Sequence, residues 1–288
     1  MKFSFSKLHR NDVKITIFIE NSLKLSVADF IKERLSFEEY SFSWDELVKA
    51  TVPRPEASIR SDLYYAIGNG DVISLRHKFY LIIPPRYSRT GKLPVELYID
   101  KLFTFLGRKY YLGLYSAAKH YGASHQQIQK EYVLHDQTSL LSISKGAIKL
   151  DFFTVSNWPE KNILLRKGDA GMFKISSPSL TAVDLVYHQT KIGGLNRTLS
   201  ILEELAEEIE FSDIKDLLTW YPHKSVLQRF GFLLNEFGQT PESVELIYEH
   251  LSLHKFYPVL LSPKSKQKAG AVTNRWKVDV NIKMESDI

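Results

Sequence analysis

The sequence predicts an α+β protein, with an N-terminal winged helix-turn-helix before a larger mixed α+β domain that ends in a helical run and a final strand. Three observations lead to this prediction. Residues 43–83 have the pattern of a helix, a proline-rich break, a second helix and a hairpin with a basic tip. Residues 95–187 mix helical and strand-like segments separated by glycine or proline. Residues 195–253 then carry four helical patterns joined by short connections.

The N-terminal region predicts an arm followed by a first helix. Residues 13–19 alternate and are rich in β-branched side chains, which favours a strand, but no partner for it is evident. We therefore expect residues 1–22 to form an extra arm or hairpin. Ser26 can cap a helix that runs to about Leu35, and residues 37–42 connect it to the next element.

Two short helices with a sharp break between them follow. Ser43 and Glu46 have the spacing of a capping box, which opens a helix to about Thr51. Pro53 and Pro55 lack a backbone donor and push the residue before each of them toward extended geometry, so they end that helix. A second helix starts near Pro55, continues to Ile67 and ends at the glycines of residues 68–70.

The second helix has two distinct faces. At about 100° per residue, Ile59, Leu63, Ala66 and Ile67 share the side that packs on the preceding helices. The other side presents small, hydroxyl and basic groups, which are the groups that base edges and phosphates accept. Its members are Ala57, Ser58, Ser61, Tyr64 and Tyr65, with Arg60 on the flank.

A predicted hairpin completes the winged domain. Residues 72–75 and 79–83 are strand-like and flank Arg76, His77 and Lys78, which would grip phosphate at the tip of a wing. The alternative is a small helical subdomain with a hairpin lid that binds no DNA. The residues expected to contact DNA are Arg54, Ser58, Arg60, Ser61, Tyr64, Arg76, His77 and Lys78.

The prolines, glycine and basic residues of segment 83–91 are typical of a linker, so we place the domains at residues 1–88 and 89–288. The second domain is expected to contain a helix start at Tyr110 and Tyr111, a helix over 116–120 that ends at Gly122, and short strands. Residues 275–282 alternate like a final strand that returns to the sheet.

Composition sets further limits. With no cysteine in 288 residues, disulfides, thiolate chemistry and cysteine-ligated metal sites are excluded. The sequence has no apolar run long enough for a membrane span and no signal-peptide stretch, so we expect a cytoplasmic protein without membrane partners.

The net charge is +5, yet residues 196–255 carry 11 acidic and 5 basic side chains. A basic body with a local acidic helical face is consistent with DNA binding.

Candidate catalytic and metal patterns are weak. Ser142 and Lys145 have Ser-x-x-Lys spacing in a turn before Gly146, without a partner motif. His250 and His254 are four residues apart, but Glu249 precedes the first histidine, whereas the metalloprotease form needs a glutamate after it. Residues 168–171 lack the Lys-Ser/Thr helix that follows a phosphate loop. We predict a protein that is not an enzyme and has no catalytic residues, no metal and no cofactor.

Two polar groups remain open to two interpretations. Ser116, His120, His125, Gln126 and Gln127 could form a ligand or partner surface, or the histidines could simply lie at helix ends. The acidic residues between positions 203 and 208 could form a partner surface or a solvated helix face.

Several segments resemble the AbiEi family, the antitoxin half of the AbiE abortive-infection systems and a group of predicted regulators of viral defence. The segments that carry the resemblance are 110–123, 176–186, 193–195, 274–278 and 285–288, and the winged domain before them has the layout of the family. The resemblance covers about residues 23–288, and its specificity lies in the order and spacing of the segments. Residues 1–22 lie outside it.

The resemblance implies an N-terminal domain that binds operator DNA and represses its own operon, and a C-terminal domain that counters a nucleotidyltransferase-like toxin. This is the type IV arrangement, which needs no stable complex of antitoxin and toxin. One departure concerns the wing: the family turns through a glycine before its tyrosine, and residues 76–80 have none. A different turn or a longer basic tip is therefore needed here.

Three function hypotheses follow. The first is an antitoxin of a type IV toxin–antitoxin system that binds an inverted repeat in its operator. The second is a one-component transcriptional regulator whose C-terminal domain senses a ligand or recruits a partner. The third is an enzyme whose winged domain is a protein-interaction module.

Overall fold

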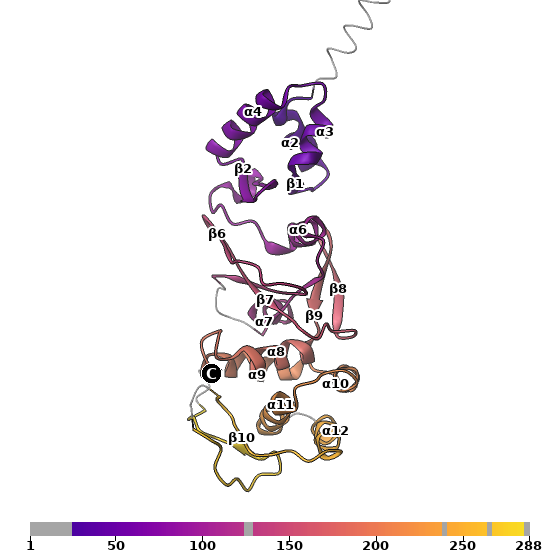
Figure 1. Ribbon diagram of the computed structural model, residues 1–288, viewed down its shortest axis with the longest axis vertical. Helices are drawn as coiled ribbons and strands as arrows, with labels where there is room; N and C mark the ends of the chain where they lie inside the picture. Colours follow the sequence, from indigo (N-terminus) through magenta and orange to yellow (C-terminus); the bar gives the residue numbers. More distant parts are fainter. Residues whose placement is uncertain (1–24, 124–128, 238–240, 264–266, 285–288) are drawn as a thin grey trace, which may run out of the picture. The chain divides into compact units, whose positions relative to one another are not determined.

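The computed structural model describes residues 25–123, 129–237, 241–263 and 267–284. The chain divides into two compact units (Figure 1). The first runs to Leu106 and also takes in Lys145–Ile148 and Gly168–Gly171; the second takes in Gly107–Ser144, Lys149–Lys167 and the chain from Met172 onward. The domain division at residue 88 stays a prediction. The arm expected over residues 1–22 lies outside the described residues.

The first unit begins with three helices and a small antiparallel sheet. Its helices are α2 (Val27–Ser36), α3 (Trp44–Thr51) and α4 (Glu56–Gly68). Strands β2 (Val72–Arg76) and β3 (Phe79–Ile82) form a hairpin, and β1 (Ser41–Ser43) pairs with β3 to give the order β1-β3-β2. This sequence of elements is compatible with a winged helix-turn-helix. Strand β1 lies at the end of the segment predicted to be only a connection.

Aromatic side chains fill the core of this region. The ring of Phe42 stands edge-on to Phe30, with 5.2 Å between centroids, and stacks on Tyr80 at 5.3 Å. Leu47 and Ile59 are fully buried beside them. The predicted apolar face of α4 is confirmed, since Ile59 and Leu63 are buried and Ala66 and Ile67 are partly buried in the same core.

Three further helical segments follow in the first unit: α5 (Pro85–Ser88), the 3₁₀ helix η1 (Val95–Leu97) and α6 (Ile99–Leu106). Helix α6 belongs to this unit because it covers the sheet. Its Leu102 and Phe103 are fully buried, and the Phe105 ring lies 5.2 Å from that of the buried Phe79 in β3. The first unit therefore extends past the predicted linker.

The second unit contains a six-stranded sheet in the order β6-β7-β5-β4-β9-β8. The strands are β4 (Tyr110–Leu112), β5 (Glu131–His135), β6 (Ile143–Lys145), β7 (Ile148–Thr154), β8 (Ile163–Gly168) and β9 (Gly171–Ser176). Strand β4 is antiparallel to β5 and parallel to β9, and β5 is parallel to β7. Helix α7 (Leu114–Ala118) and the 3₁₀ helix η2 (Lys119–Tyr121) connect β4 to β5, and Gly122 ends them at φ 77° as predicted.

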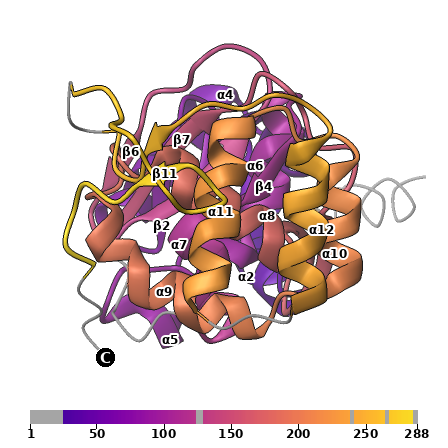
Figure 2. The same ribbon diagram turned by 90° about the horizontal axis from the view of Figure 1, so that it is seen from below.

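The predicted helical run is confirmed on one side of this sheet (Figures 1 and 2). It consists of α9 (Leu195–Glu207), α10 (Phe211–Leu218), α11 (Lys224–Glu236) and α12 (Pro241–Ser252), and helix α8 (Pro178–His188) precedes it. Helix α8 is buried along almost its whole length. Ser177 caps it by accepting a hydrogen bond from the backbone N–H of Leu180. Helix α8 thus forms the centre of the unit.

Three local predictions in the second unit are wrong. Tyr110 and Tyr111 lie in strand β4 and do not start a helix. Residues 143–145 form strand β6, although they were expected in a turn. The final strand β11 (Val278–Asp279) does not return to the six-stranded sheet, because it pairs in parallel with β10 (Val259–Leu260) as a separate two-stranded sheet.

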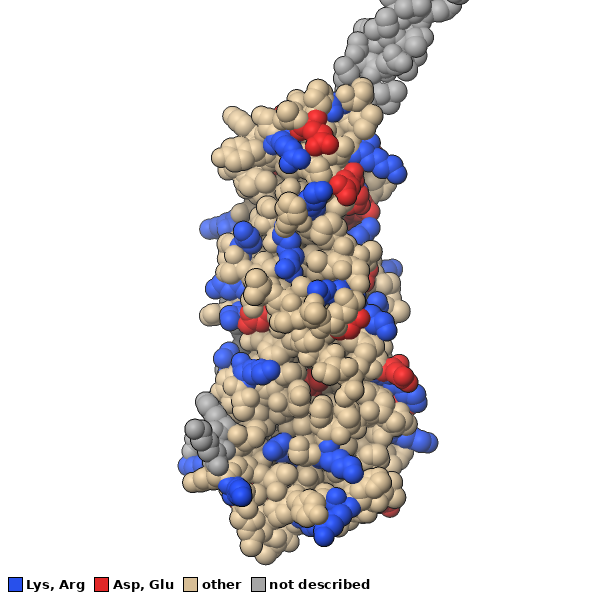
Figure 3. Space-filling model, viewed as in Figure 1, with Lys and Arg blue, Asp and Glu red and all other residues tan. Residues whose placement is uncertain are grey.

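Among the described residues, no helix has both the length and the apolar character needed to cross a membrane. Basic side chains are spread along the face shown in Figure 3, with acidic side chains among them, and do not gather in one cluster there. Any DNA contact on that face therefore depends on how individual cations are placed.

Candidate nucleic-acid interface

The exposed side of α4 is the first part of the candidate interface. The helix begins directly after Pro55 and buries Ile59 and Leu63, so the side chains between these positions point outward. Tyr64 is 78% exposed and Tyr65 is 73% exposed. Ala57 and Ser61 are also exposed, while Ser58 is partly buried. Two large aromatic side chains therefore stand in solvent beside a serine on one helix face.

Arg60 lies at the junction of α3, α4 and the hairpin. Its guanidinium carbon is 4.4 Å from the centroid of the Trp44 ring, and its Nη2 is 3.2 Å from the carboxylate of Glu56, one turn earlier. Burial raises the pKa of Tyr80 in β3, and the positive charge of Arg60 opposes that shift. Stacking on Trp44 restricts the Arg60 side chain and still leaves it exposed, which suits a phosphate contact.

Arg54 is held by α4 itself. Its Nη2 lies 2.5 Å from the Asp62 carboxylate and donates a weaker hydrogen bond to Ser58 Oγ at 3.3 Å. The Arg54 side chain is only 18% exposed. Of the predicted DNA contacts, Arg54 and Ser58 are thus engaged with each other, and Asp62 neutralises the arginine.

The turn between β2 and β3 presents two side chains. His77 and Lys78 are exposed at this turn, and Lys78 takes a φ of 60°, the left-handed conformation that a glycine would otherwise supply. A register shift between Ser74 and Arg76 accompanies the turn. The hairpin therefore closes tightly without glycine and needs no longer tip.

Arg76 does not belong to the tip. It ends strand β2, its side chain is partly buried, and its Nη1 is buried without a hydrogen-bond partner among the described residues. The sequence predicted three basic residues at the tip of the hairpin, and the structure places only His77 and Lys78 there.

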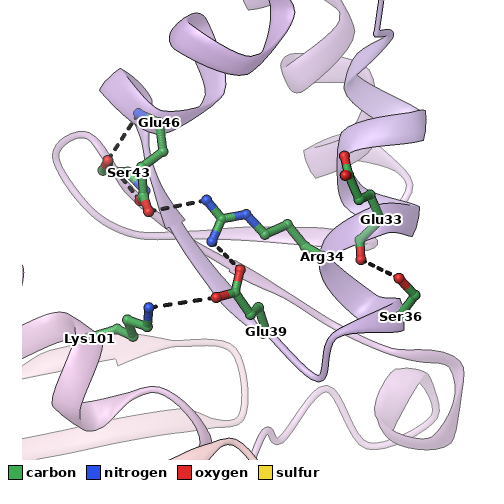
Figure 4. A network of polar contacts seen from close by, with 7 residues as sticks. All are labelled: Glu33, Arg34, Ser36, Glu39, Ser43, Glu46 and Lys101. Atoms are coloured by element: carbon green, nitrogen blue, oxygen red, sulfur yellow. Dashed lines mark hydrogen bonds and ion pairs between the residues drawn. The ribbon is translucent and has the colours of Figure 1, made fainter.

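A polar network fixes the helices behind this face (Figure 4). Ser43 and Glu46 form the predicted capping box of α3. Arg34, at the end of α2, binds Glu46 at 3.1 Å and also Glu39, which in turn lies 3.7 Å from Lys101 of α6. Burial raises the pKa of Glu46, but the hydrogen bonds from Ser43 and the Arg34 charge outweigh it and leave the pKa below its usual range. The network joins α2, α3 and α6 through ionised groups.

Of the polar group noted around Ser116, only Ser116 and His120 lie among the described residues. Ser116 is buried, donates a hydrogen bond to the Glu131 carboxylate at 2.5 Å and accepts one from the backbone N–H of Tyr132 at 2.8 Å. His120 is partly buried against the Phe173 ring, and burial lowers its pKa to about 4. His125, Gln126 and Gln127 lie outside the described residues.

The other histidine and acidic groups noted in the sequence lie in α9 and at the end of α12. His250 lies in the last turn of α12, and His254 is exposed beyond its end. No cluster of three His, Cys, Asp or Glu residues that could hold a metal ion occurs among the described residues. Glu203 and Glu204 are partly buried in α9, whereas Glu207 and Glu208 are exposed, so the acidic run is only partly a solvated face.

One cluster was not predicted at all. Asp184 of α8 is buried at the centre of the second unit, where the hydroxyl of Tyr111 donates a hydrogen bond to it at 2.9 Å. Both residues fall within segments that resemble the AbiEi family, but nothing in their spacing marks them as partners.

The comparisons with known proteins bear on the second unit most directly. Residues 111–236 match the family described as the AbiEi antitoxin C-terminal domain. This stretch is therefore similar to the C-terminal domain of the AbiEi antitoxins. The resemblance inferred from the sequence segments is thereby confirmed, and the match includes both Tyr111 and Asp184.

The fold also resembles a solved structure. The crystal structure of the RV2827C protein from Mycobacterium tuberculosis matches with a TM-score of 0.61 at 13% sequence identity, over 86% of this chain and 89% of that chain. At this identity the likeness shows a shared fold alone. No curated protein matches the chain.

Proposed function

We propose that this protein is the antitoxin of a type IV toxin–antitoxin system, with one task in each part of the chain. The N-terminal domain binds double-stranded operator DNA and represses its own operon. The C-terminal domain counteracts a nucleotidyltransferase-like toxin without forming a stable complex with it. Both act in the cytoplasm, as binding functions rather than as an enzyme. The match of residues 111–236 to the AbiEi antitoxin C-terminal domain supports the antitoxin role.

The observation that carries the DNA-binding part is the exposed face of α4 next to an exposed basic turn. In this proposal α4 enters the major groove, Ser61 and Tyr64 approach base edges, and Arg60 contacts a phosphate. His77 and Lys78 hold the backbone beside the groove. Two such domains bind an inverted repeat with half-sites about one helical turn apart.

The structure changes the contribution to DNA binding that is expected of two residues. Arg54 is paired with Asp62, and its charge reaches DNA only if that ion pair opens. Arg76 lies in strand β2, so its role is to support the turn. The cations that carry the interface are therefore Arg60 and Lys78.

The test is a gel-shift titration with the DNA directly upstream of the gene over several salt concentrations. Arg60→Ala combined with Lys78→Ala should weaken binding at least tenfold and reduce the slope of log affinity against log salt by about 2, since about one counterion is released per phosphate contact. Lys32→Ala is the matched control, because it removes one exposed cation from α2 in the same unit. Equal affinities for the double variant and the wild type would rule out this placement of the DNA.

A second candidate function is favoured by the cavity beside Asp184 described below. In this alternative the protein is a one-component transcriptional regulator whose C-terminal domain senses a ligand or recruits a partner. A toxin gene immediately downstream, whose product loses its toxicity when this protein is coexpressed, supports the antitoxin. DNA affinity that changes when the cavity is filled, with no toxin gene nearby, supports the regulator.

A further inference from the structure

The second unit has a small cavity of about 80 Å³ at the side of α8, and Tyr187 at its edge is exposed to solvent. Tyr111 of β4, Asp184 and His188 of α8, and Tyr221 and His223 ahead of α11 line it. A water molecule occupies roughly 30 Å³ of liquid, so the space suits a head group of a few atoms. The inner part of the cavity thus fits a small chemical group.

Asp184 gives the cavity its charge. Its side chain is buried, and the Tyr111 hydroxyl is its hydrogen-bond donor at 2.9 Å. Among the described residues, no Lys, Arg or His lies within ion-pair distance of this carboxyl group. A buried carboxylate without a cationic partner is costly, and the cost falls when a cation binds next to it.

Aromatic rings form the walls around the carboxyl group. Tyr187 and His223 line the cavity and stack with 4.7 Å between ring centroids. Tyr111 also lines it and is held edge-on by Trp158, which is not a lining residue, at 5.6 Å. Trp220, which also lines the cavity, is fixed because its Nε1–H donates to Asn162 at 2.7 Å. The faces of Trp and Tyr rings attract cations within about 6 Å, most strongly where water is excluded.

We propose that this cavity binds an alkylammonium group, with Asp184 as its counter-ion and the surrounding aromatic rings as its cage. The group belongs either to a free aliphatic amine or to a lysine side chain of a partner protein. Both sources present the same –CH₂–NH₃⁺ end, whose three donors can bond the carboxylate. This binding site shares no residue with the DNA contacts proposed for α4.

Binding should depend on pH through Asp184. Burial raises the pKa of Asp184 to about 7, although the Tyr111 hydrogen bond works in the opposite direction. Burial lowers the pKa of His188 to about 3, with the charges of Lys191 and His223 acting in the same direction, and burial also lowers the pKa of His223. Burial raises the pKa of Tyr111 and of Tyr221 well above 10. Between pH 6.5 and 8 the carboxyl group is therefore the group that changes charge, and ammonium affinity should rise across this range.

The experiment titrates the full-length protein with n-butylammonium chloride at pH 8 and follows tryptophan fluorescence, with n-butanol as the neutral isostere. We expect saturable binding of n-butylammonium with no matching response to n-butanol, and at least tenfold weaker binding for Asp184→Asn. Glu160→Gln, which removes an exposed carboxylate beside the cavity-lining Pro159, should bind like the wild type. Equal responses to the amine and the alcohol, or equal affinities for Asp184→Asn and the wild type, would overturn the proposal.

A second variant keeps the test decisive if Asp184→Asn does not fold. Tyr111→Phe keeps the ring and removes the hydrogen bond that favours the ionised carboxyl group, so the midpoint of the pH-dependent ammonium binding should move upward. An unchanged midpoint would contradict the role of Asp184. To identify the source, putrescine is compared with N-acetyl-lysine N-methylamide: binding of putrescine alone points to a free amine, and binding of the lysine compound points to a partner's lysine.

Discussion

The burial of one histidine gives the second unit a defined response to acid. His188 is 5% exposed, and its ring packs 4.7 Å from the ring of Phe153 and 4.7 Å from that of Tyr187. Because burial lowers its folded-state pKa to about 3, the unfolded chain takes up a proton at a higher pH than the folded chain does. Its contribution to stability is therefore present above about pH 6.5 and is lost as the pH falls toward 3.

We predict that His188→Phe weakens this acid response. The replacement keeps an aromatic ring in the same packing and removes the buried proton acceptor. Relative to the wild type, the variant should gain about 1.4 kcal/mol in its free energy of unfolding for each pH unit below 6.5, measured by urea denaturation from pH 7 to pH 4. Asp184 changes the free energy of unfolding in the opposite direction as the pH falls. Only the difference in free energy of unfolding between the variant and the wild type therefore reports on His188. His254→Phe, at an exposed position, is the control; a parallel pH profile for His188→Phe and the wild type would refute the prediction.

The positions of some side chains could be predicted from the sequence, and those of others could not. The exposure of Ser61 and Tyr64 followed from helical periodicity, because the buried Ile59 and Leu63 fix which way the helix faces. The placement of Arg76 did not follow, because it depends on a register shift and on the positive φ of Lys78. Asp184 was missed because a lone acid in an apolar helix carries no spacing signal. Its neighbours arrive from strand β4 and from the segment ahead of α11, and only the tertiary fold brings them together.

At the scale of elements, the contact between α11 and the C-terminal segment depends on a missing side chain. Gly231 lies within α11, and the fully buried Trp276 packs against it. A Cβ at position 231 would stand 2.2 Å from a ring atom of Trp276, far inside any van der Waals contact. An added methyl group would therefore displace either the tryptophan ring or the backbone of α11.

We predict that Gly231→Ala destabilises the second unit by about 3 kcal/mol, at the upper end of the usual cost of overpacking a core. Urea denaturation followed by circular dichroism measures the change. Gly68→Ala is the control, because Gly68 ends α4 where an added methyl group would meet nothing within 4 Å, and alanine favours a helix by roughly 0.5–1 kcal/mol over glycine. A Gly231→Ala protein as stable as the wild type would show that Trp276 does not pack as described.

The elements differ in how well the sequence predicted them. Helices α2 and α3 were found because a capping residue and an apolar period both mark them, and their capping boxes are present. Strand β4 was misread because three consecutive apolar residues fit a helix start as well as a buried strand. Strand β11 was recognised as a strand, but its partner β10 is only two residues long and gives too weak a pattern to fix the pairing.

At the scale of the whole molecule, the sequence signal for a linker and the boundary of the compact unit fall at different places. Prolines and a glycine mark residues 83–91, yet Leu93, Val95 and Leu97 beyond them are buried. Helix α6 then places Phe105 against Phe79 and Lys101 3.7 Å from Glu39. Turn-forming residues indicate where a chain can bend, and burial decides where a unit ends.

This difference predicts how fragments of the chain behave. A fragment of residues 1–106 should unfold cooperatively and keep the DNA affinity of the full-length protein. A fragment of residues 1–88 should melt at a clearly lower temperature, because it lacks α6 and exposes the apolar surface around Phe79. Thermal melts by circular dichroism and gel shifts with the upstream DNA measure both properties.

Phe105→Ala in the longer fragment is the intermediate case, and it should lower the melting temperature less than the truncation does. If the two fragments melt at the same temperature, the segment 89–106 contributes nothing to the first unit, and the boundary near residue 88 is the better one.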